Sequence, residues 1–183
     1  MMSRAMGFFV LGALTWSFLE YVIHRWLGHD RRFKRGPFAK EHIRHHIEGD
    51  YFSPSWKKVV FAAAVALFAV PVAVLVLGAA AGVAYVAGLL LFYGAYEVLH
   101  RREHTSAGLG AYGRWARRHH FFHHFENGKM NHGVTSPLWD LIFRTYQKPD
   151  IIHVPRRLCM SWLRDPETGG VRREHAGTFV LGG

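Results

Sequence analysis

The sequence predicts an all-α integral membrane protein: a bundle of membrane helices with a cytoplasmic helical cap that holds a histidine-rich site for two metals. Three observations predict this fold class. The apolar residues gather in long runs, the charged residues gather between those runs, and histidine motifs recur where the runs end. Half of the 183 residues are hydrophobic, although the formal net charge is +10. Such segregation is typical of a membrane protein whose basic segments face anionic lipid.

Three apolar runs have the length of membrane-spanning helices. They cover residues 5–23, 59–77 and 82–99. An α-helix rises about 1.5 Å per residue, so about 20 apolar residues cross the hydrocarbon core. The second and third runs are consecutive, and we expect Gly78 to Gly82 to form the turn between them. We therefore expect a membrane-embedded domain over residues 1–147, followed by a polar C-terminal tail over residues 148–183, whose last residues, 169–183, we expect to be loose.

The distribution of basic residues predicts the orientation of these helices. Nine Lys or Arg lie between His24 and Lys58, and none lies in the turn of the hairpin. By the positive-inside rule, we expect the N-terminus outside, with the histidine-bearing segments and the C-terminus in the cytoplasm. Nucleic acid is not an expected partner, because the basic segments are rich in histidine and flank the apolar runs. The single cysteine, Cys159, excludes an internal disulfide and a cysteine-based metal site.

Ten of the fourteen histidines fall into four spaced motifs. Two of these motifs have the spacing H-x-x-H-H, which places three imidazoles on one face of a helix. Random placement of the histidines would give roughly 0.08 such motifs in a chain of this length, so chance does not explain the pattern. The ten residues are His24, His29, His42, His45, His46, His100, His104, His120, His123 and His124.

Ten imidazoles are enough for two metals with about five ligands each, because one metal takes about three to six donors. Adjacent helix residues point about 100° apart, so neighbours such as His45 and His46 can face different metals. We expect carboxylates to orient the rings and to offset the metal charge. Burial at the end of an apolar run favours Glu20, which we expect to hold His24, and Glu97. The full set of candidates is Glu20, Glu97, Glu103, Glu126 and Asp140.

Two other histidines are ambiguous. His132 follows Asn131 in a glycine-flanked loop, where it is either an eleventh ligand or a contact to the substrate. His119 adjoins the fourth motif but lies off the face that His120 and His124 share, so it is a weaker candidate for a metal ligand than His132.

A site built from histidines beside a membrane favours oxygen activation on a lipid. A hydrolytic metal site usually has fewer ligands and an open water position. In this interpretation O2 and two electrons hydroxylate an unactivated C–H bond, and no separate side-chain nucleophile is needed. A desaturase would use the same site, so it is one alternative. A histidine-rich membrane metal transporter or storage protein is another, although the apolar runs lack the polar residues that transport requires.

The motifs HRWLGH (24–29), HIRHH (42–46), HRREH (100–104) and HFFHH (120–124), followed by NHGVTSPLWD (131–140), resemble the fatty acid hydroxylase/sterol desaturase superfamily. The resemblance implies that all ten motif histidines bind two iron ions, which zinc or another divalent metal can replace in a recombinant preparation. It implies a lipid substrate, whether fatty acyl, sphingolipid-like, sterol-like or carotenoid. It also implies a separate electron donor, cytochrome b5-like or a ferredoxin with its reductase. Only three apolar runs are present, so a second subunit could supply a further membrane crossing, and an oligomer is compatible with the sequence.

Overall fold

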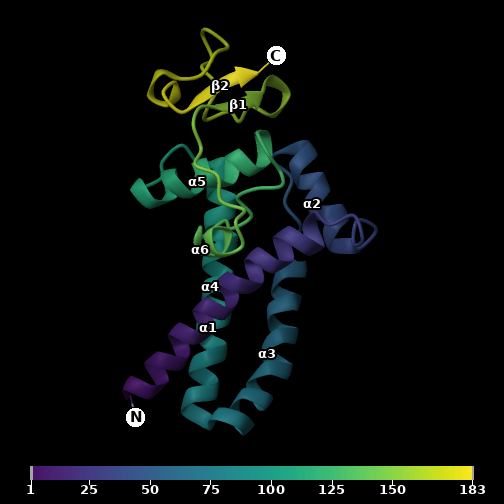
Figure 1. Ribbon diagram of the computed structural model, residues 1–183, viewed down its shortest axis with the longest axis vertical. Helices are drawn as coiled ribbons and strands as arrows, with labels where there is room; N and C mark the ends of the chain where they lie inside the picture. The colour runs from purple at the N-terminus through teal and green to yellow at the C-terminus, as the bar shows by residue number, and fades with distance from the viewer. Residues whose placement is uncertain (1, 183) are drawn as a thin grey trace. The chain divides into compact units, whose positions relative to one another are not determined.

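Helices dominate the computed structural model, which describes residues 2–182 (Figure 1). A π-helical turn, Ile23–Gly28, continues the first helix. The elements are α1 (Met2–Val22), α2 (Pro37–Glu48), α3 (Ser55–Leu77), α4 (Ala79–Thr105), α5 (Ala111–Phe125), α6 (Leu138–Ile142), β1 (Ile152–Pro155) and β2 (Phe179–Gly182). Three helices, α1 with its π-helical continuation, α3 and α4, are each long and apolar enough to cross a bilayer. The predicted helical membrane class is therefore confirmed.

The described residues form two compact units, and the boundaries between the units fall inside α1 and α4. One unit contains the residues up to 19 together with residues 53–97, which make up most of the apolar helices. The other contains residues 20–52 and the residues from 98 onward, and it includes every motif histidine.

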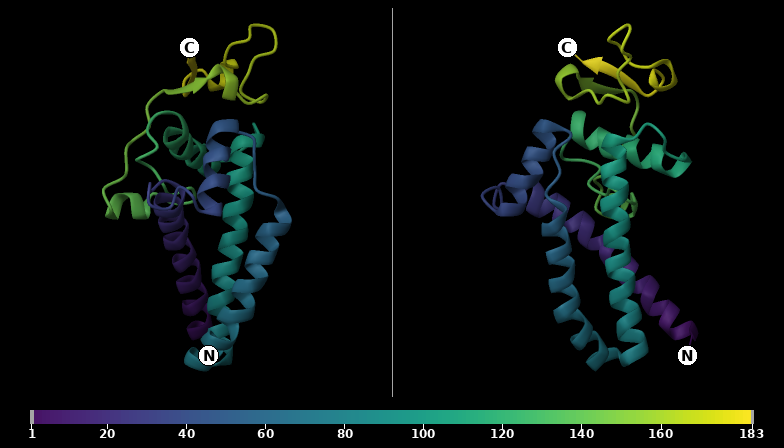
Figure 2. Two further views of the ribbon diagram at one scale, coloured as in Figure 1. Left: turned by 90° about the vertical axis from the view of Figure 1, so that its right-hand side faces the viewer. Right: turned by 180° about the vertical axis from the view of Figure 1, so that it is seen from behind.

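In the first unit, α3 and α4 form an antiparallel hairpin (Figures 1 and 2). The turn is tighter than predicted, since Gly78 alone joins the helices with a φ of 84°, a conformation that favours glycine. Small residues let α1 and α4 touch. A Cβ on Gly88 would lie 2.0 Å from the Phe9 carbonyl oxygen, and a Cβ on Gly12 would lie 1.9 Å from that of Tyr85. Backbone therefore meets backbone, as in close-packed membrane bundles.

The second unit positions the histidines. The segment that carries His42, His45 and His46 is helical, as its H-x-x-H-H spacing predicts. This helix, α2, begins with Pro37, a residue whose fixed φ suits a first helical position. The amphipathic stretch from 134 to 146 forms a shorter helix than its pattern suggests, because α6 has only five residues. Its first residues are not helical, since the Val134 and Thr135 amides donate hydrogen bonds to the Glu20 carboxylate.

The expectation that residues 169–183 are loose is wrong, because this stretch contains β2. Strands β1 and β2 pair in parallel, with Ile152 opposite Phe179. Alternate residues of β1 are buried, as expected for a strand with one face on a core. That core joins the C-terminal segment to α5, and it consists of Phe121, Phe122, Ile152, Val154, Met160, Trp162, Leu163 and Phe179. The apolar residues here are too widely spaced among polar ones to give a strong local signal, and they become a core only when they pack on α5.

Candidate metal centre

The ten motif histidines lie in two groups of five, and within each group one ring nitrogen per residue lies within 4.8 Å of the others. The first group is His24, His29, His42, His46 and His123. The second group is His45, His100, His104, His120 and His124. The groups are adjacent, because the rings of His46 and His124 stack with their centroids 3.9 Å apart. The structure therefore brings all ten predicted residues together, and it leaves His119 and His132 outside both groups.

Neighbouring histidines on one helix belong to different groups, as their 100° separation predicts. Helix α2 contributes His46 to the first group and His45 to the second. Helix α5 contributes His123 to the first and His124 to the second. The two groups therefore do not come one from each half of the chain: each half provides one histidine to the group that is otherwise built by the other half.

The spacing of each motif matches the helix that carries it. His100 and His104 are four residues apart on α4, which brings them to one face of an α-helix. His24 and His29 are five residues apart, and an ordinary α-helix would turn them away from each other. The π-helical turn Ile23–Gly28 has more residues per turn, so both rings join the first group. The five-residue spacing was the available sequence signal for this turn.

Distances between ring nitrogens fit ligands of one metal ion. The Nε2 atom of His29 lies 2.8 Å from that of His42 and 2.8 Å from that of His123. In the second group, the Nε2 atoms of His45 and His100 are 3.0 Å apart. Two imidazole nitrogens at right angles on a metal, with bonds of about 2.0–2.1 Å, are separated by roughly 2.9 Å. The donor sets therefore fit five- or six-coordinate metals that favour imidazole.

Backbone carbonyls fix the orientation of several of these rings. The Nδ1–H of His24 donates to the His132 carbonyl at 2.5 Å, that of His45 to Tyr51 at 2.7 Å, and that of His123 to Met130 at 2.8 Å. A ring that donates through Nδ1 keeps the lone pair on Nε2 free for a metal. These carbonyls orient the rings, which is one of the two roles that we expected of carboxylates.

Burial keeps the imidazoles outside the membrane helices neutral, which is the protonation state that binds metals. Burial lowers the pKa of His29 to about 4. It also holds the pKa well below the usual value for His42, His46, His120, His123 and His124, and the neighbouring imidazoles add to the effect. At neutral pH these rings therefore offer lone pairs to a cation.

A loop from 131 to 135 supports the first group, and Asp140 supports that loop. The buried Asp140 carboxylate accepts hydrogen bonds from the amides of His132 and Gly133, both at 2.8 Å, and from the Thr145 hydroxyl at 2.7 Å. His119 donates to it through Nε2 at 3.2 Å. Burial acts to raise the pKa of Asp140, but these hydrogen bonds outweigh burial and hold the pKa below its usual value. Asp140 therefore reaches the first group through the loop.

Two of the predicted carboxylates have other partners. Glu20 accepts hydrogen bonds from Val134 and Thr135, while the ring of His24 binds a carbonyl, so the expected pairing of Glu20 with His24 is wrong. A helical side chain leans toward the N-terminus of its helix, which takes Glu20 away from a residue one turn later. Glu97 forms an ion pair with Lys58.

The contacts of His119, His132 and Glu126 are also defined in the structure. His119 is buried between the rings of Trp115 and Tyr146 while it binds Asp140. His132 packs against His123 at 5.0 Å between centroids, and its Nε2–H donates to the Lys129 carbonyl. Glu126 accepts hydrogen bonds from His153.

Glu103 is more deeply buried than Glu20 and Glu97, the two carboxylates that the sequence favoured. It is fully buried, and neither carboxylate oxygen has a hydrogen-bond partner in the described part of the chain. Its position next to His104 was a usable signal. The buried Arg117 interacts with it electrostatically.

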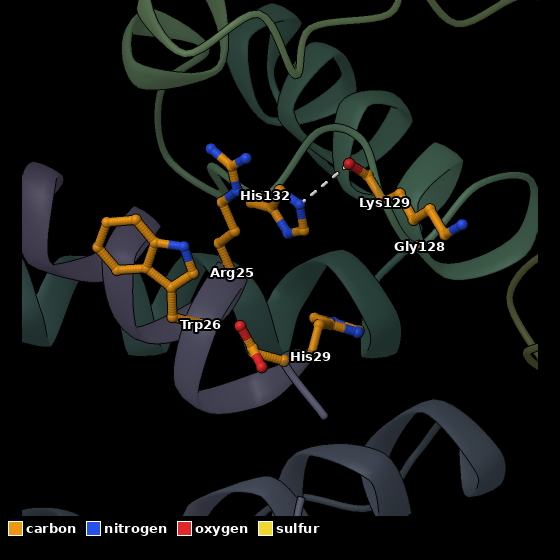
Figure 3. Close-up of a pocket in the computed structure, with 7 residues that line it drawn as sticks. Arg25, Trp26, His29, Gly128, Lys129 and His132 are labelled. Atoms are coloured by element: carbon orange, nitrogen blue, oxygen red, sulfur yellow. Dashed lines mark hydrogen bonds between the residues drawn. The ribbon is translucent and has the colours of Figure 1, made fainter. Parts of the chain in front are cut away.

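A cavity of about 280 Å³ opens beside the first group (Figure 3). His29 forms part of its wall, and Figure 3 shows the ring of His132 between Arg25 and Lys129. Trp26 adds an aromatic surface. The Asp30 carboxylate also lines the cavity, so the lining carries both signs of charge and suits a polar group close to the histidines.

Comparison with known proteins identifies the family. The model of the fatty acid hydroxylase family matches residues 9–145, three quarters of the chain, and this range contains both histidine groups. The chain belongs to the fatty acid hydroxylase family. The fatty acid hydroxylase match ends before β1, so the C-terminal segment lies outside it.

Several characterised fatty acid hydroxylases resemble the chain. It is 35% identical to fatty acid 2-hydroxylase of Rattus norvegicus, over 76% of this chain and 39% of the relative. It is 33% identical to ceramide very long chain fatty acid hydroxylase scs7 of Schizosaccharomyces pombe, over 78% of this chain and 43% of the relative. The chain thus spans about two fifths of the length of these relatives. A solved structure titled full-length scs7p, with only its hydroxylase domain visible, has a TM-score of 0.59 and 28% identity, covering 81% of this chain and 58% of that one.

Proposed function

We propose that this protein is an O2-dependent membrane di-iron enzyme that hydroxylates an unactivated C–H bond of a lipid acyl chain. The observation that carries the proposal is the pair of adjacent five-histidine groups, because one mononuclear site would leave half of these buried imidazoles without a role. The names of the relatives, fatty acid 2-hydroxylases and ceramide fatty acid hydroxylases, support an acyl substrate. The three apolar helices support a substrate that resides in the bilayer.

The overall reaction consumes R–H, O2, two electrons and two protons, and it yields R–OH and water. Two bound iron ions would supply the oxidising chemistry, and the first and second groups would hold one ion each. The protein's residues orient the ligands: the carbonyls of His132, Tyr51 and Met130 fix three rings. Burial excludes water from the centre, which protects a reactive site from side reactions. The cavity beside His29 would take the polar end of the lipid, since Arg25, Lys129 and Asp30 line it.

The remaining parts of the proposal concern partners and orientation. The two electrons come from a separate protein, cytochrome b5-like or a ferredoxin with its reductase. The excess of Lys and Arg around the histidine motifs supports a cytoplasmic centre with the N-terminus outside. A donor in the cytoplasm would then reach the centre directly.

The test compares the lipids of a host that produces the full chain with those of a host that produces a variant. His123→Ala should remove a ligand of the first group, and His120→Ala a ligand of the second. We expect hydroxylated acyl chains only with the unaltered protein. The matched control is His153→Ala, which changes a mostly exposed histidine outside both groups.

The same lipid analysis separates the alternatives. A hydroxylase adds one oxygen atom to the acyl chain, whereas a desaturase removes two hydrogen atoms and adds none. A metal transporter or storage protein would change the metal content of the host and leave its acyl chains unaltered. Unchanged lipids, in a host that holds an electron donor and metal-loaded protein, would contradict the proposal.

A further inference from the structure

The C-terminal segment, residues 150–182, contacts the three helices that build the second group. Arg157 donates to the Ile47 carbonyl near the end of α2, at 3.3 Å. Trp162 donates through Nε1 to the His104 carbonyl in the last turn of α4, at 2.7 Å. The core of this segment packs on α5 through Phe121. Figures 1 and 2 show the yellow and light-green C-terminal strands next to α5.

The last turn of α4 depends on side chains from elsewhere. The final carbonyls of a helix have no partner inside the helix. Here Trp162 binds the carbonyl of His104, while Arg117 binds those of Arg102 and Ser106. The Arg117 guanidinium also lies 3.9 Å from the centre of the Trp162 ring, which is a cation–π contact. Trp162 and Arg117 therefore act together as the cap of α4.

This cap matters for His104 in particular. His24, His45 and His123 each have a ring nitrogen in a close hydrogen bond to a carbonyl. The ring of His104 interacts with the Gly49 backbone but makes no such close hydrogen bond among the described residues. Its position therefore depends strongly on the backbone of α4 and on ring packing, which includes Phe121 at 4.9 Å and Phe52 at 5.8 Å between centroids. Phe121 belongs to the same core as Trp162.

We propose that the C-terminal segment is a clasp for the second group, and that Trp162 is the positioning residue that sets His104. The proposal rests on the two-metal centre proposed above. It gives a function to a segment that lies outside the family match, and it assigns the two groups different supports. The loop held by Asp140 supports the first group, and the clasp supports the second.

The test is Trp162→Phe in the full chain, purified in detergent and loaded with Co²⁺ alone. Phenylalanine keeps an aromatic ring for Arg117 and the core, but it removes the N–H that binds His104. Changes in groups that orient metal ligands typically lower metal affinity by roughly 10–100-fold, so we expect bound metal to fall from two ions per chain toward one. We also expect faster hydrogen exchange at residues 102–105. Trp56→Phe, at an exposed position in α3, is the matched control and should change neither.

A second pair of variants shows which position is lost. His24→Ala removes a ligand of the first group and should leave about one ion per chain. Adding Trp162→Phe to it should remove that remaining ion, whereas adding Trp56→Phe should not. Two ions and unchanged exchange in Trp162→Phe would overturn the clasp, as would parallel loss of both ions with general unfolding. Fewer than two ions in the unaltered protein would instead overturn the two-metal centre on which the clasp depends.

Discussion

Replacement of Asp140 by Asn should destabilise the protein strongly, although it changes only one atom of the side chain. One carboxylate oxygen accepts from the His132 amide and the Thr145 hydroxyl, and the other accepts from the Gly133 amide and His119. Asparagine has a single acceptor oxygen. In either orientation of the Asn amide, its NH₂ group faces the backbone N–H of His132 or of Gly133. That N–H then has no acceptor.

The size of the effect follows from these contacts. Hydrogen bonds to a charged group contribute about 1.5–3 kcal/mol each, and a buried unpaired donor costs about 1–3 kcal/mol. Loss of one charged hydrogen bond and one unpaired amide together give roughly 2.5–6 kcal/mol, against a total stability of about 5–15 kcal/mol for a typical domain. For a chain of this size, about 2–4 °C per kcal/mol predicts a fall in the thermal midpoint of roughly 5–24 °C.

The assay is thermal unfolding of the purified protein in detergent, together with metal analysis. Because the loop carries the His132 carbonyl that orients His24, the variant should also lose metal from the first group before the second. Asp50→Asn, at an exposed site, is the matched control and should unfold like the unaltered protein. An Asp140→Asn variant with an unchanged midpoint and two bound metals would refute the reasoning.

Three other changes test separate parts of the structure. Glu20→Gln should lower the thermal midpoint only slightly, because one side-chain oxygen can still accept from the amides of Val134 and Thr135. Glu20→Ala leaves both amides unpaired, at a cost of about 1–3 kcal/mol each, so equal midpoints for the two variants would contradict this. Metal-free protein should lose stability as the pH falls from 6.5 to about 4. In the folded chain the pKa values of His29 and His132 are about 4, so these rings stay neutral, whereas in the unfolded chain they take up protons near pH 6.5. A thermal midpoint that does not change over this pH range would be the contrary result. Gly133→Ala should halve the bound metal, because its Cβ would lie 2.1 Å from the Ser136 carbonyl oxygen and force the loop away from His24; two ions per chain would argue against that displacement.

The parts of the structure that could be predicted have a periodic signal in the sequence. The apolar runs predict α1, α3 and α4, and the H-x-x-H-H motifs predict histidine faces on α2 and α5. Adjacent histidines predict two groups, because neighbouring side chains on a helix diverge. The assignment of His123 to the first group could not be predicted, because it depends on how α5 packs.

The supports of the site could not be predicted, because they join residues far apart in the chain. His24 binds a carbonyl 108 residues later, and a carbonyl exists at every position, so no residue type marks it. Glu20 reaches a loop 114 residues away. Trp162 binds the carbonyl of His104, 58 residues earlier, from a segment whose local pattern indicates neither helix nor strand. Contacts of this kind arise only from tertiary packing.

The exchange of histidines between the two halves has a consequence for biogenesis. Helix α5 is the last helix with motif histidines to leave the ribosome, and it provides one member of the first group and two of the second. In the two-metal centre proposed above, a nascent chain that stops before α5 would hold only four imidazoles for one ion and three for the other. Neither coordination sphere can be completed during early translation, so we expect metal uptake to follow insertion of all three apolar helices into the bilayer.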